Sequence, residues 1–309
     1  MTTLPIALAG IGKIAQDEHV PALRASSDWH LAATISRNHG IDGVKGFKTM
    51  DDFLADPGDI RTVSLALPPG PRFDYAIKAM EAGLNVMLEK PPAVTLGAAR
   101  HLCLCAEEAG VSLYMTWHSR MGAACAAAAD RLRGKTLKSV RITWCEDVRR
   151  THPGQDWLWK PGNLGVYDPG INAFSILARI LDRPASISKV TMEVPEGRHT
   201  PIRSDIVLAH PDKPEFTALF NWRYEGDPVW DMEIETEDDR FTLTRSGSAI
   251  VEPDGTQHHE SFDDEYSALY RHMAELVASG GSETDLRPFE MTADSFLLAE
   301  RTVGAPFDW

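Results

Sequence analysis

The fold is decided by residues 4–36, which read LPIALAGIGKIAQDEHVPALRASSDWHLAATIS. The stretch begins with the apolar run Leu4–Ala9, which is typical of a short strand buried on both faces. Helical spacing follows over Lys13–Ser26, and a second strand is predicted at His30–Ser36. A strand, a glycine turn, a helix and a second strand in this order predict one unit of a parallel sheet.

The turn in this unit has the pattern G-x-G-x-x-A from Gly10 to Ala15. Gly10 permits a tight turn, Gly12 lets the backbone approach a pyrophosphate, and Ala15 lets the helix pack closely on the strand. The pyrophosphate would rest on the helix N-terminus at Lys13 and Ile14, where free N–H groups and the helix dipole favour an anion. A glycine turn of this kind can be purely structural, but its position between a buried strand and a helix predicts a nicotinamide dinucleotide site.

The residues after the second strand bear on which dinucleotide binds. NAD-preferring sites usually place a carboxylate there for the ribose hydroxyls, whereas this sequence has Ser36 and Arg37. A hydroxyl and a cation can hold a 2′-phosphate, and an arginine can also stack on the adenine. We therefore predict NADP as the cofactor and leave use of NAD open. The alternative is that Arg37 is an exposed loop arginine.

The first third of the chain repeats the alternation of strand and helix. Further strands are predicted at Thr62–Leu67, Asn85–Leu88 and Val111–Thr116, and helices at Phe73–Gly83 and Thr95–Gly110. Thr95 is suited to cap its helix and Gly110 to end it. Repeated units with apolar, non-alternating strands predict a Rossmann-type, doubly wound parallel sheet over residues 1–118.

After His118 the pattern changes to strands of period two. Their inward positions are predicted to be Val140, Ile142, Trp144, Val190, Met192, Val194, Phe216, Ala218, Phe220, Trp222, Met232, Ile234, Phe241 and Leu243. Such strands suit an open, mostly antiparallel sheet with one face covered. The helices expected to cover it are Gly170–Leu181, Glu265–Ser279 and Phe289–Val303. The fold class is therefore α/β, with an α+β domain for substrate binding and oligomerisation over residues 119–309.

Bulk composition excludes several classes of protein. The net charge of −14 argues against a nucleic-acid partner, which would need a basic surface. Cys103, Cys105, Cys125 and Cys145 lack metal-ligand spacing and are expected to be reduced thiols. No stretch approaches the roughly 18 apolar residues of a membrane helix, and the N-terminus lacks a cationic signal region. We expect a cytoplasmic protein with no membrane partner and no bound metal.

The segment Glu89-Lys90-Pro91-Pro92 follows the predicted strand Asn85–Leu88. Open α/β sheets bind ligands at the carboxyl ends of their strands, so Lys90 could meet a substrate beside the nicotinamide. The prolines fix the backbone that follows the lysine. By itself, a loop lysine is more often a solvated surface charge.

Together, the Gly10–Ala15 turn and Glu89-Lys90-Pro91 resemble the signature of the glucose–fructose oxidoreductase / inositol dehydrogenase (Gfo/Idh/MocA) family. The resemblance covers essentially the whole chain, and within the family it points to the bacterial NADP-preferring L-arabinose and D-galactose 1-dehydrogenases. The stretches that carry this narrower resemblance are 115–120, 146–150, 152–155 and 164–172. It implies a sugar dehydrogenase in which Glu89 and Lys90 belong to the cofactor site and Lys90 is also catalytic.

Residues 164–172 read LGVYDPGIN, so Asp168 and Asn172 share one face of a helix that begins near Asp168. The alternative is that Asp168 only caps this helix, with Pro169 at its first position. Much of the family has a histidine where Asn172 stands, and asparagine cannot take a proton. Acid–base work is therefore assigned to Asp168 or Lys90, with Asn172 orienting the substrate. The implied reaction oxidises a cyclic aldose at C1 to the aldonolactone, with hydride transfer to NADP.

The same resemblance points to contacts for the sugar. Candidates for its hydroxyls are His118, Glu146 and His152, and candidates for an aromatic wall are Trp117, Trp157, Trp159 and Trp230. Each tryptophan could equally belong to a core, and each of these histidines could be structural. The arabinose enzymes have a tryptophan directly before the histidine that matches His152, whereas this chain has Thr151, so the identity of the sugar stays open.

Two other functions stay open beside this one. The chain could oxidise a different sugar or a polyol carbon, or it could sense NADP or a sugar without turnover. Lys90, Asp168 and the polar loop between them favour turnover. The open sheet of the second domain also offers a face for a homodimer.

Overall fold

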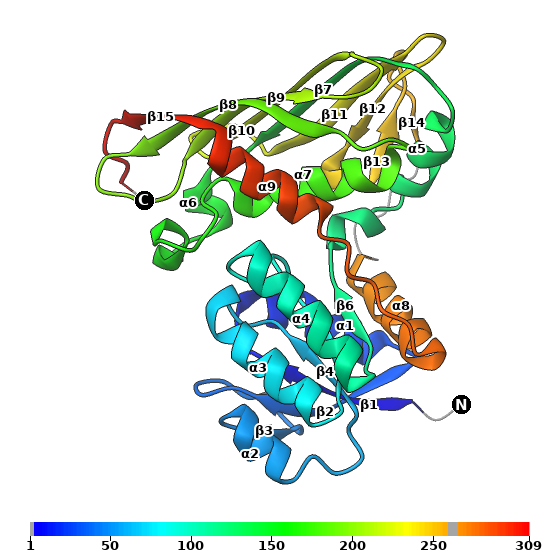
Figure 1. Cartoon of the computed structure of the whole chain (residues 1–309), viewed down its shortest axis with the longest axis vertical. Helices are drawn as coiled ribbons and strands as arrows, with labels where there is room; N and C mark the ends of the chain where they lie inside the picture. The colour runs from blue at the N-terminus through cyan, green and yellow to red at the C-terminus, as the bar shows by residue number, and fades with distance from the viewer. Residues whose placement is uncertain (1–2, 259–264, 309) are drawn as a thin grey trace. The chain divides into compact units, whose positions relative to one another are not determined.

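The computed structural model of the chain describes residues 3–258 and 265–308 (Figure 1). The chain divides into two compact units. The first comprises Met1–His118 with Asp263–Leu286, and the second comprises Ser119–Phe262 with Arg287–Trp309.

Helix α8 (Glu265–Ser279) belongs to the first unit, although it follows most strands of the second sheet in the sequence. The indole Nε1 of Trp29 donates to the carbonyl of Tyr270 at 2.8 Å, and the Tyr270 hydroxyl lies 2.7 Å from Nδ1 of His19. The units therefore differ from the predicted continuous domains 1–118 and 119–309, and this helix does not cover the second sheet as we expected. An amphipathic helix shows which of its faces is buried, but not which sheet it covers.

The first unit is built on a parallel, six-stranded sheet with the order β3-β2-β1-β4-β5-β6. Its strands are β1 (Leu4–Ala9), β2 (Trp29–Ile35), β3 (Lys45–Phe47), β4 (Thr62–Leu65), β5 (Asn85–Leu88) and β6 (Leu113–Met115). The strand order reverses beside β1, so the carboxyl ends of β1 and β4 flank the switch point where such sheets bind ligands. The predicted Rossmann-type sheet is confirmed. The three-residue strand β3 was not predicted because it is too short to show a period.

The helices of the first unit besides α8 are η1 (Ala15–His19), α1 (Val20–Ala25), α2 (Met50–Ala55), α3 (Pro69–Glu81) and α4 (Leu96–Ala109). α3 and α4 lie side by side on the sheet (Figure 1). The predicted ends of α4 are confirmed, because Thr95 Oγ1 accepts from the Ala98 N–H at 3.2 Å and Gly110 has a left-handed φ of 65°. η1 is a π-helical turn, which suits the position of Pro21, a residue that has no N–H for the regular ladder.

The second unit is built on a nine-stranded sheet with the order β14-β13-β12-β11-β7-β10-β9-β8-β15. Its strands are β7 (Leu137–Cys145), β8 (Ser186–Pro195), β9 (Arg203–Ala209), β10 (Glu215–Asn221), β11 (Val229–Thr236), β12 (Arg240–Thr244), β13 (Ala249–Val251), β14 (Gln257–His258) and β15 (Ala299–Gly304). Only the β7–β10 and β8–β15 pairs are parallel among the described residues, which confirms a mostly antiparallel sheet. The predicted inward side chains are all buried except Val194, which is half-buried.

Two long helices, α7 (Tyr167–Ile180) and α9 (Arg287–Leu298), lie side by side against one face of this sheet (Figure 1). The shorter helices that follow β6 are η2 (His118–Met121), α5 (Cys125–Leu132), α6 (Val148–Thr151), η3 (Asp156–Trp159) and η4 (Arg245–Gly247). The side chains of α7 are almost all buried, because the helix packs against the sheet and against both α9 and α5.

Several elements of the second unit differ from the prediction, among them the end of α9 and strand β9. The helix predicted at Phe289–Val303 ends at Leu298, and the residues after it pair in parallel with β8 as strand β15. Strand β9 was not predicted, because one of its inward positions is Ser204 instead of an apolar residue. The Ser204 hydroxyl lies 2.7 Å from the buried hydroxyl of Tyr167, which satisfies both groups.

No described helix is long and apolar enough to cross a membrane. The four cysteines are free thiols: Cys125 and Cys145 are buried, and Cys103 and Cys105 are half-buried.

Candidate active site

The turn after β1 contains two glycines whose surroundings differ. Gly10 has a φ of +87°, and a Cβ there would meet the backbone nitrogen of Leu67 at 2.8 Å. A Cβ on Gly12 would meet nothing within 4 Å, so this backbone faces open space. Ala15 is fully buried under the sheet. These observations fit a turn that packs on β4 from one side and leaves room for a phosphate group on the other.

The helix that follows this turn begins at Lys13 and Ile14, which we predicted to lie at the pyrophosphate. Both side chains are exposed, and the Lys13 ammonium pairs with Asp17 one turn along. The helix N-terminus therefore offers backbone N–H groups to an anion, with a lysine beside them that already has one carboxylate partner.

Ser36 and Arg37 lie directly after β2, at the carboxyl edge of the first sheet. The Ser36 hydroxyl accepts a hydrogen bond from the His39 N–H at 3.3 Å. Arg37 is exposed and forms no ion pair with any residue in the ranges 3–258 and 265–308. A cation in this state is available to a 2′-phosphate.

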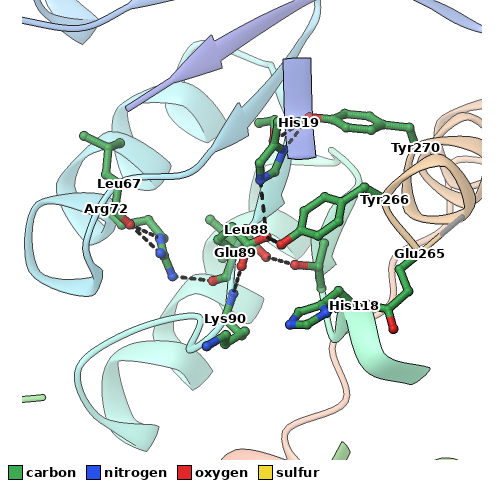
Figure 2. Close-up of polar contacts among 12 residues, drawn as sticks. His19, Leu67, Arg72, Leu88, Glu89, Lys90, His118, Glu265, Tyr266 and Tyr270 are labelled. Atoms are coloured by element: carbon green, nitrogen blue, oxygen red, sulfur yellow. Dashed lines mark hydrogen bonds and ion pairs between the residues drawn. The ribbon is translucent and has the colours of Figure 1, made fainter. Parts of the chain in front are cut away.

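Glu89 follows β5 and is only 5% exposed. Its Oε1 accepts from the Tyr266 hydroxyl at 2.7 Å and lies 3.2 Å from Nε2 of His19, and its Oε2 accepts from the Lys90 N–H at 2.9 Å (Figure 2). Burial alone would raise the pKa of Glu89, but the hydrogen bond and charge of His19, helped by His118 and Tyr266, hold it well below its ordinary value. The carboxylate is therefore ionised, and both of its oxygens have partners inside the protein.

Lys90, which we predicted to be catalytic, is half-buried at the carboxyl end of β5. Its backbone is held from a second side by Arg72, a buried residue on α3. The Arg72 guanidinium donates to the carbonyls of Glu89 and Pro91 and, at 2.9 Å through Nε, to the carbonyl of Leu67 (Figure 2). The Lys90–Pro91 peptide bond is cis.

His118 was predicted as a sugar contact, and the structure places it in the first unit. Its Nδ1 lies 2.6 Å from Oε2 of Glu265, and its ring stacks on Tyr266 with 5.7 Å between the centroids. Burial alone would lower the pKa of His118, but the carboxylates of Glu265 and Glu89 raise it above the ordinary value, with Lys90 opposing them. The charges of Glu265, Glu89 and Lys90 therefore all act on His118.

In the second unit, Glu146 follows β7 and is 2% exposed. Its Oε1 accepts from the Thr151 hydroxyl at 2.8 Å and from the Trp222 indole at 3.1 Å, and its Oε2 accepts from the Trp230 indole at 2.9 Å. Three donors on separate elements thus fix one buried carboxylate, as a buried charge requires.

His152 connects this carboxylate to Asp168. Its Nδ1 lies 3.5 Å from Oε1 of Glu146 and 2.9 Å from the Thr151 hydroxyl, and its Nε2 lies 3.4 Å from Oδ2 of Asp168. Asn172 follows one turn after Asp168 on α7, as predicted. The Oδ1 atom of Asn172 is buried and has no hydrogen-bond partner among the described residues. The structure therefore brings together four of the predicted site residues: Glu146, His152, Asp168 and Asn172.

The interpretation of Asp168 as a helix cap is wrong. Helix α7 begins at Tyr167, its N-cap is Val166, and no side chain caps it. Asp168 lies inside the first turn, where a carboxylate still interacts favourably with the helix dipole. Its side chain is thus not used for capping and points toward His152.

The predicted aromatic walls divide into core and site residues. Trp117 and Trp159 are almost fully buried, and Trp117 donates its indole N–H to the Asp285 carbonyl. Trp157 and Trp230 are half-buried, and of these Trp230 contacts Glu146. The structure therefore places Trp230 beside Glu146, whereas Trp117 belongs to the core of the first unit.

Sequence reasoning missed several residues of both groups. They are His19, Arg72, Tyr266 and Tyr270 in the first unit, and Trp222 as a partner of Glu146 in the second. Trp222 extends the alternating pattern of β10, and that pattern assigned it only to the core. Across the described part of the chain there is no group of three or more His, Cys, Asp or Glu side chains that could hold a metal ion.

Comparison with known proteins identifies the class. The family model for Gfo/Idh/MocA proteins, an oxidoreductase family with an NAD-binding Rossmann fold, matches residues 4–117. The chain is also 35% identical over 301 residues to the galactose 1-dehydrogenase of Pseudomonas fluorescens, and the match covers 97% of each chain. The chain therefore belongs to the Gfo/Idh/MocA family of oxidoreductases.

Solved structures agree with this assignment. The crystal structure of D-galactose-1-dehydrogenase from Rhizobium etli is similar with a TM-score of 0.95 and 40% identity, covering 100% of this chain and 99% of that one. A 3-ketoreductase from Actinomadura kijaniata, crystallised with NADP and TDP-benzene, shares the fold at a TM-score of 0.84 and 18% identity, covering 99% of this chain and 100% of that one.

Proposed function

We propose that this chain is an NADP-preferring aldose 1-dehydrogenase that oxidises D-galactose, L-arabinose or a similar cyclic sugar at C1 to the aldonolactone. The observation that carries the proposal is the group Glu146–His152–Asp168 beside the carbonyl oxygen of Asn172, which has no partner within residues 3–258 and 265–308. Similarity to two galactose 1-dehydrogenases over nearly the whole chain supports the same substrate class.

A sugar needs several polar contacts of fixed direction, and this group supplies them. The oxygen of Asn172 can accept a hydrogen bond from a sugar hydroxyl, and burial makes that bond valuable because water does not replace it. The indole of Trp230 is half-buried and held in place by Glu146, so its ring can cover the C–H face of a sugar.

Asp168 is the proposed general base. It would take the proton of the C1 hydroxyl, and NADP⁺ supplies the hydride acceptor when it is bound. Asn172 would orient the hydroxyl, since its amide cannot take a proton. Lys90 would carry part of the charge that develops on the oxygen, as a cation fixed beforehand does at low cost. A positioned base contributes on the order of 10²–10⁴-fold in rate.

The preference for NADP over NAD rests on Arg37. This guanidinium is exposed without an ion-pair partner in the described ranges, and no carboxylate follows β2 to bind ribose hydroxyls. The open backbone at Gly12 and the helix start at Lys13 would hold the pyrophosphate.

An initial-rate panel tests the proposed function. D-galactose, L-arabinose, D-fucose and D-xylose are each assayed with NADP and with NAD, and the product is identified as lactone or keto-sugar. We expect NADPH formation with at least one aldose and a lactone product. A keto-sugar product would indicate oxidation at another carbon. Tight NADP binding without turnover of any sugar would indicate a sensor.

We also propose a homodimer that forms through the uncovered face of the second sheet. This face has a groove lined by side chains of both charges, including Arg141, Arg240, Glu215 and Glu233. A face with both charges can pair with a second copy of itself about a two-fold axis. Light scattering at micromolar concentration should give twice the monomer mass, and a monomer mass would exclude the dimer.

Because the four thiols are free, the cytoplasm is the proposed location.

A further inference from the structure

The buried residues behind Lys90 form a continuous polar chain that the proposed chemistry does not use. It runs from Ser64 on β4 through Tyr270 and His19 to Glu89, and Tyr270 and Tyr266 both come from α8, more than 170 residues away in the sequence. All five residues are at most 6% exposed. Such a chain is costly to bury unless every member is satisfied, so it calls for an explanation.

Hydrogen bonds join the side chains of this buried polar chain one after another. The Tyr270 hydroxyl donates to Ser64 Oγ at 3.3 Å and lies 2.7 Å from Nδ1 of His19. The other ring nitrogen, Nε2, donates to the Glu89 carboxylate at 3.2 Å. One imidazole ring thus joins the Tyr270 hydroxyl to the buried carboxylate of Glu89.

Glu89 and Arg72 hold the backbone on either side of the Lys90 side chain. Oε2 of Glu89 accepts from the Lys90 N–H at 2.9 Å, and the Arg72 guanidinium donates to the carbonyls of Glu89 and Pro91 (Figure 2). Three backbone groups of residues 89–91 are thus held by two buried side chains. A rigid fork such as guanidinium can hold two carbonyls at once, which an ammonium group does less well.

We propose that Glu89, held in place by His19 and Tyr266, is a positioning residue that sets the direction of the Lys90 side chain. Helix α8 is therefore part of the functional unit, because it supplies the Tyr266 hydroxyl that holds Glu89. This inference rests on the proposed function of Lys90 as a group that acts on the sugar oxygen.

The variants Glu89→Gln and Tyr266→Phe test the proposal, with Asn85→Ala as the control. Asn85 lies at the opposite end of β5, and its amide side chain bonds to the Arg61 carbonyl and the Ser112 N–H. Its loss weakens the same strand without touching Lys90. Tyr266→Phe removes one donor to Glu89 and keeps the ring, so it is informative even if Glu89→Gln does not fold.

We expect kcat with the best aldose to fall about 100-fold in Glu89→Gln, the loss that a misplacement of about 1 Å can cause. Tyr266→Phe should show a smaller loss of the same kind. NADP affinity should change by less than about threefold. The deuterium isotope effect at C1 should rise in both variants, because hydride transfer becomes slower. A simple loss of folded enzyme would lower kcat without changing the isotope effect.

A second readout does not depend on activity. Reductive ¹³C-methylation gives each lysine an NMR signal, and Lys90→Arg identifies the signal of Lys90. We expect this signal to shift in Glu89→Gln and Tyr266→Phe but to stay in place in Asn85→Ala. An unchanged Lys90 signal, or equal changes in the control, would overturn the proposal. If the wild-type protein oxidised no sugar, the proposed function would fail, and the NMR signals would still decide the role of Glu89.

Discussion

Nε2 of His152 lies 3.4 Å from Oδ2 of Asp168. The other nitrogen of the same ring lies 3.5 Å from the buried carboxylate of Glu146, which Thr151, Trp222 and Trp230 hold in place. The position of the proposed base thus depends on a carboxylate that is satisfied by three donors. A side chain positioned in this way is ready to react without reorganisation.

The first prediction concerns His152. Replacing it by alanine removes the group between Asp168 and Glu146, so we expect kcat to fall by about 10- to 100-fold, as misplacement of a reacting group does. NADP affinity should not change, because the residue lies in the second unit, whereas the glycine turn lies in the first. Steady-state kinetics and cofactor titration measure both quantities. Wild-type kcat in His152→Ala would show that Asp168 holds its position without it.

A second prediction concerns the cofactor preference. Arg37→Ala should weaken NADP binding by about 10- to 100-fold, since a hydrogen bond to a charged group contributes ~1.5–3 kcal/mol. Binding of NAD, which has no 2′-phosphate, should stay the same. Arg24→Ala is a matched control, because Arg24 is an exposed arginine elsewhere on the first unit. Equal losses for both cofactors would mean that Arg37 only stacks on the adenine.

Alanine substitutions at the two glycines of the first turn should have different effects on stability and on cofactor binding. Gly10→Ala forces a residue with a Cβ into a φ of +87° and against the Leu67 backbone, so unfolding free energy should fall by at least ~1–3 kcal/mol. Gly12→Ala meets no atom within 4 Å and should change stability by less than about 0.5 kcal/mol. Its effect should appear as weaker cofactor binding. Denaturant titration and cofactor titration separate the two outcomes.

The sequence predicted the first sheet, the ends of α4 and the inward faces of the second sheet's strands, because each depends on local spacing. It did not show that α8 returns to the first unit, because its amphipathic pattern suits either sheet. It also missed His19 and Arg72. His19 lies 70 residues from its partner Glu89, and Arg72 lies 17 residues from Glu89 and 19 from Pro91. Long-range polar partners leave no periodic signal, so sequence reasoning finds the reacting residues more easily than those that hold them.

Stability should depend on pH through His118. Its pKa is raised in the folded protein, chiefly by the carboxylate of Glu265 against the effect of burial. The stability that this pair contributes is complete below the unfolded pKa of about 6.5 and is lost as pH rises through the folded value. Unfolding free energy of the wild type should therefore fall more steeply above neutral pH than that of His118→Gln. Parallel curves for the two proteins would contradict this.

The central claim is that Asp168 takes the proton of a sugar C1 hydroxyl while NADP⁺ accepts the hydride. The most direct test is the rate of NADPH formation from D-galactose by Asp168→Ala, measured beside its NADP affinity. Removal of a positioned base should lower kcat by on the order of 10²–10⁴-fold and leave NADP binding intact. Near-wild-type turnover by Asp168→Ala would contradict the claim and pass the role of base to Lys90.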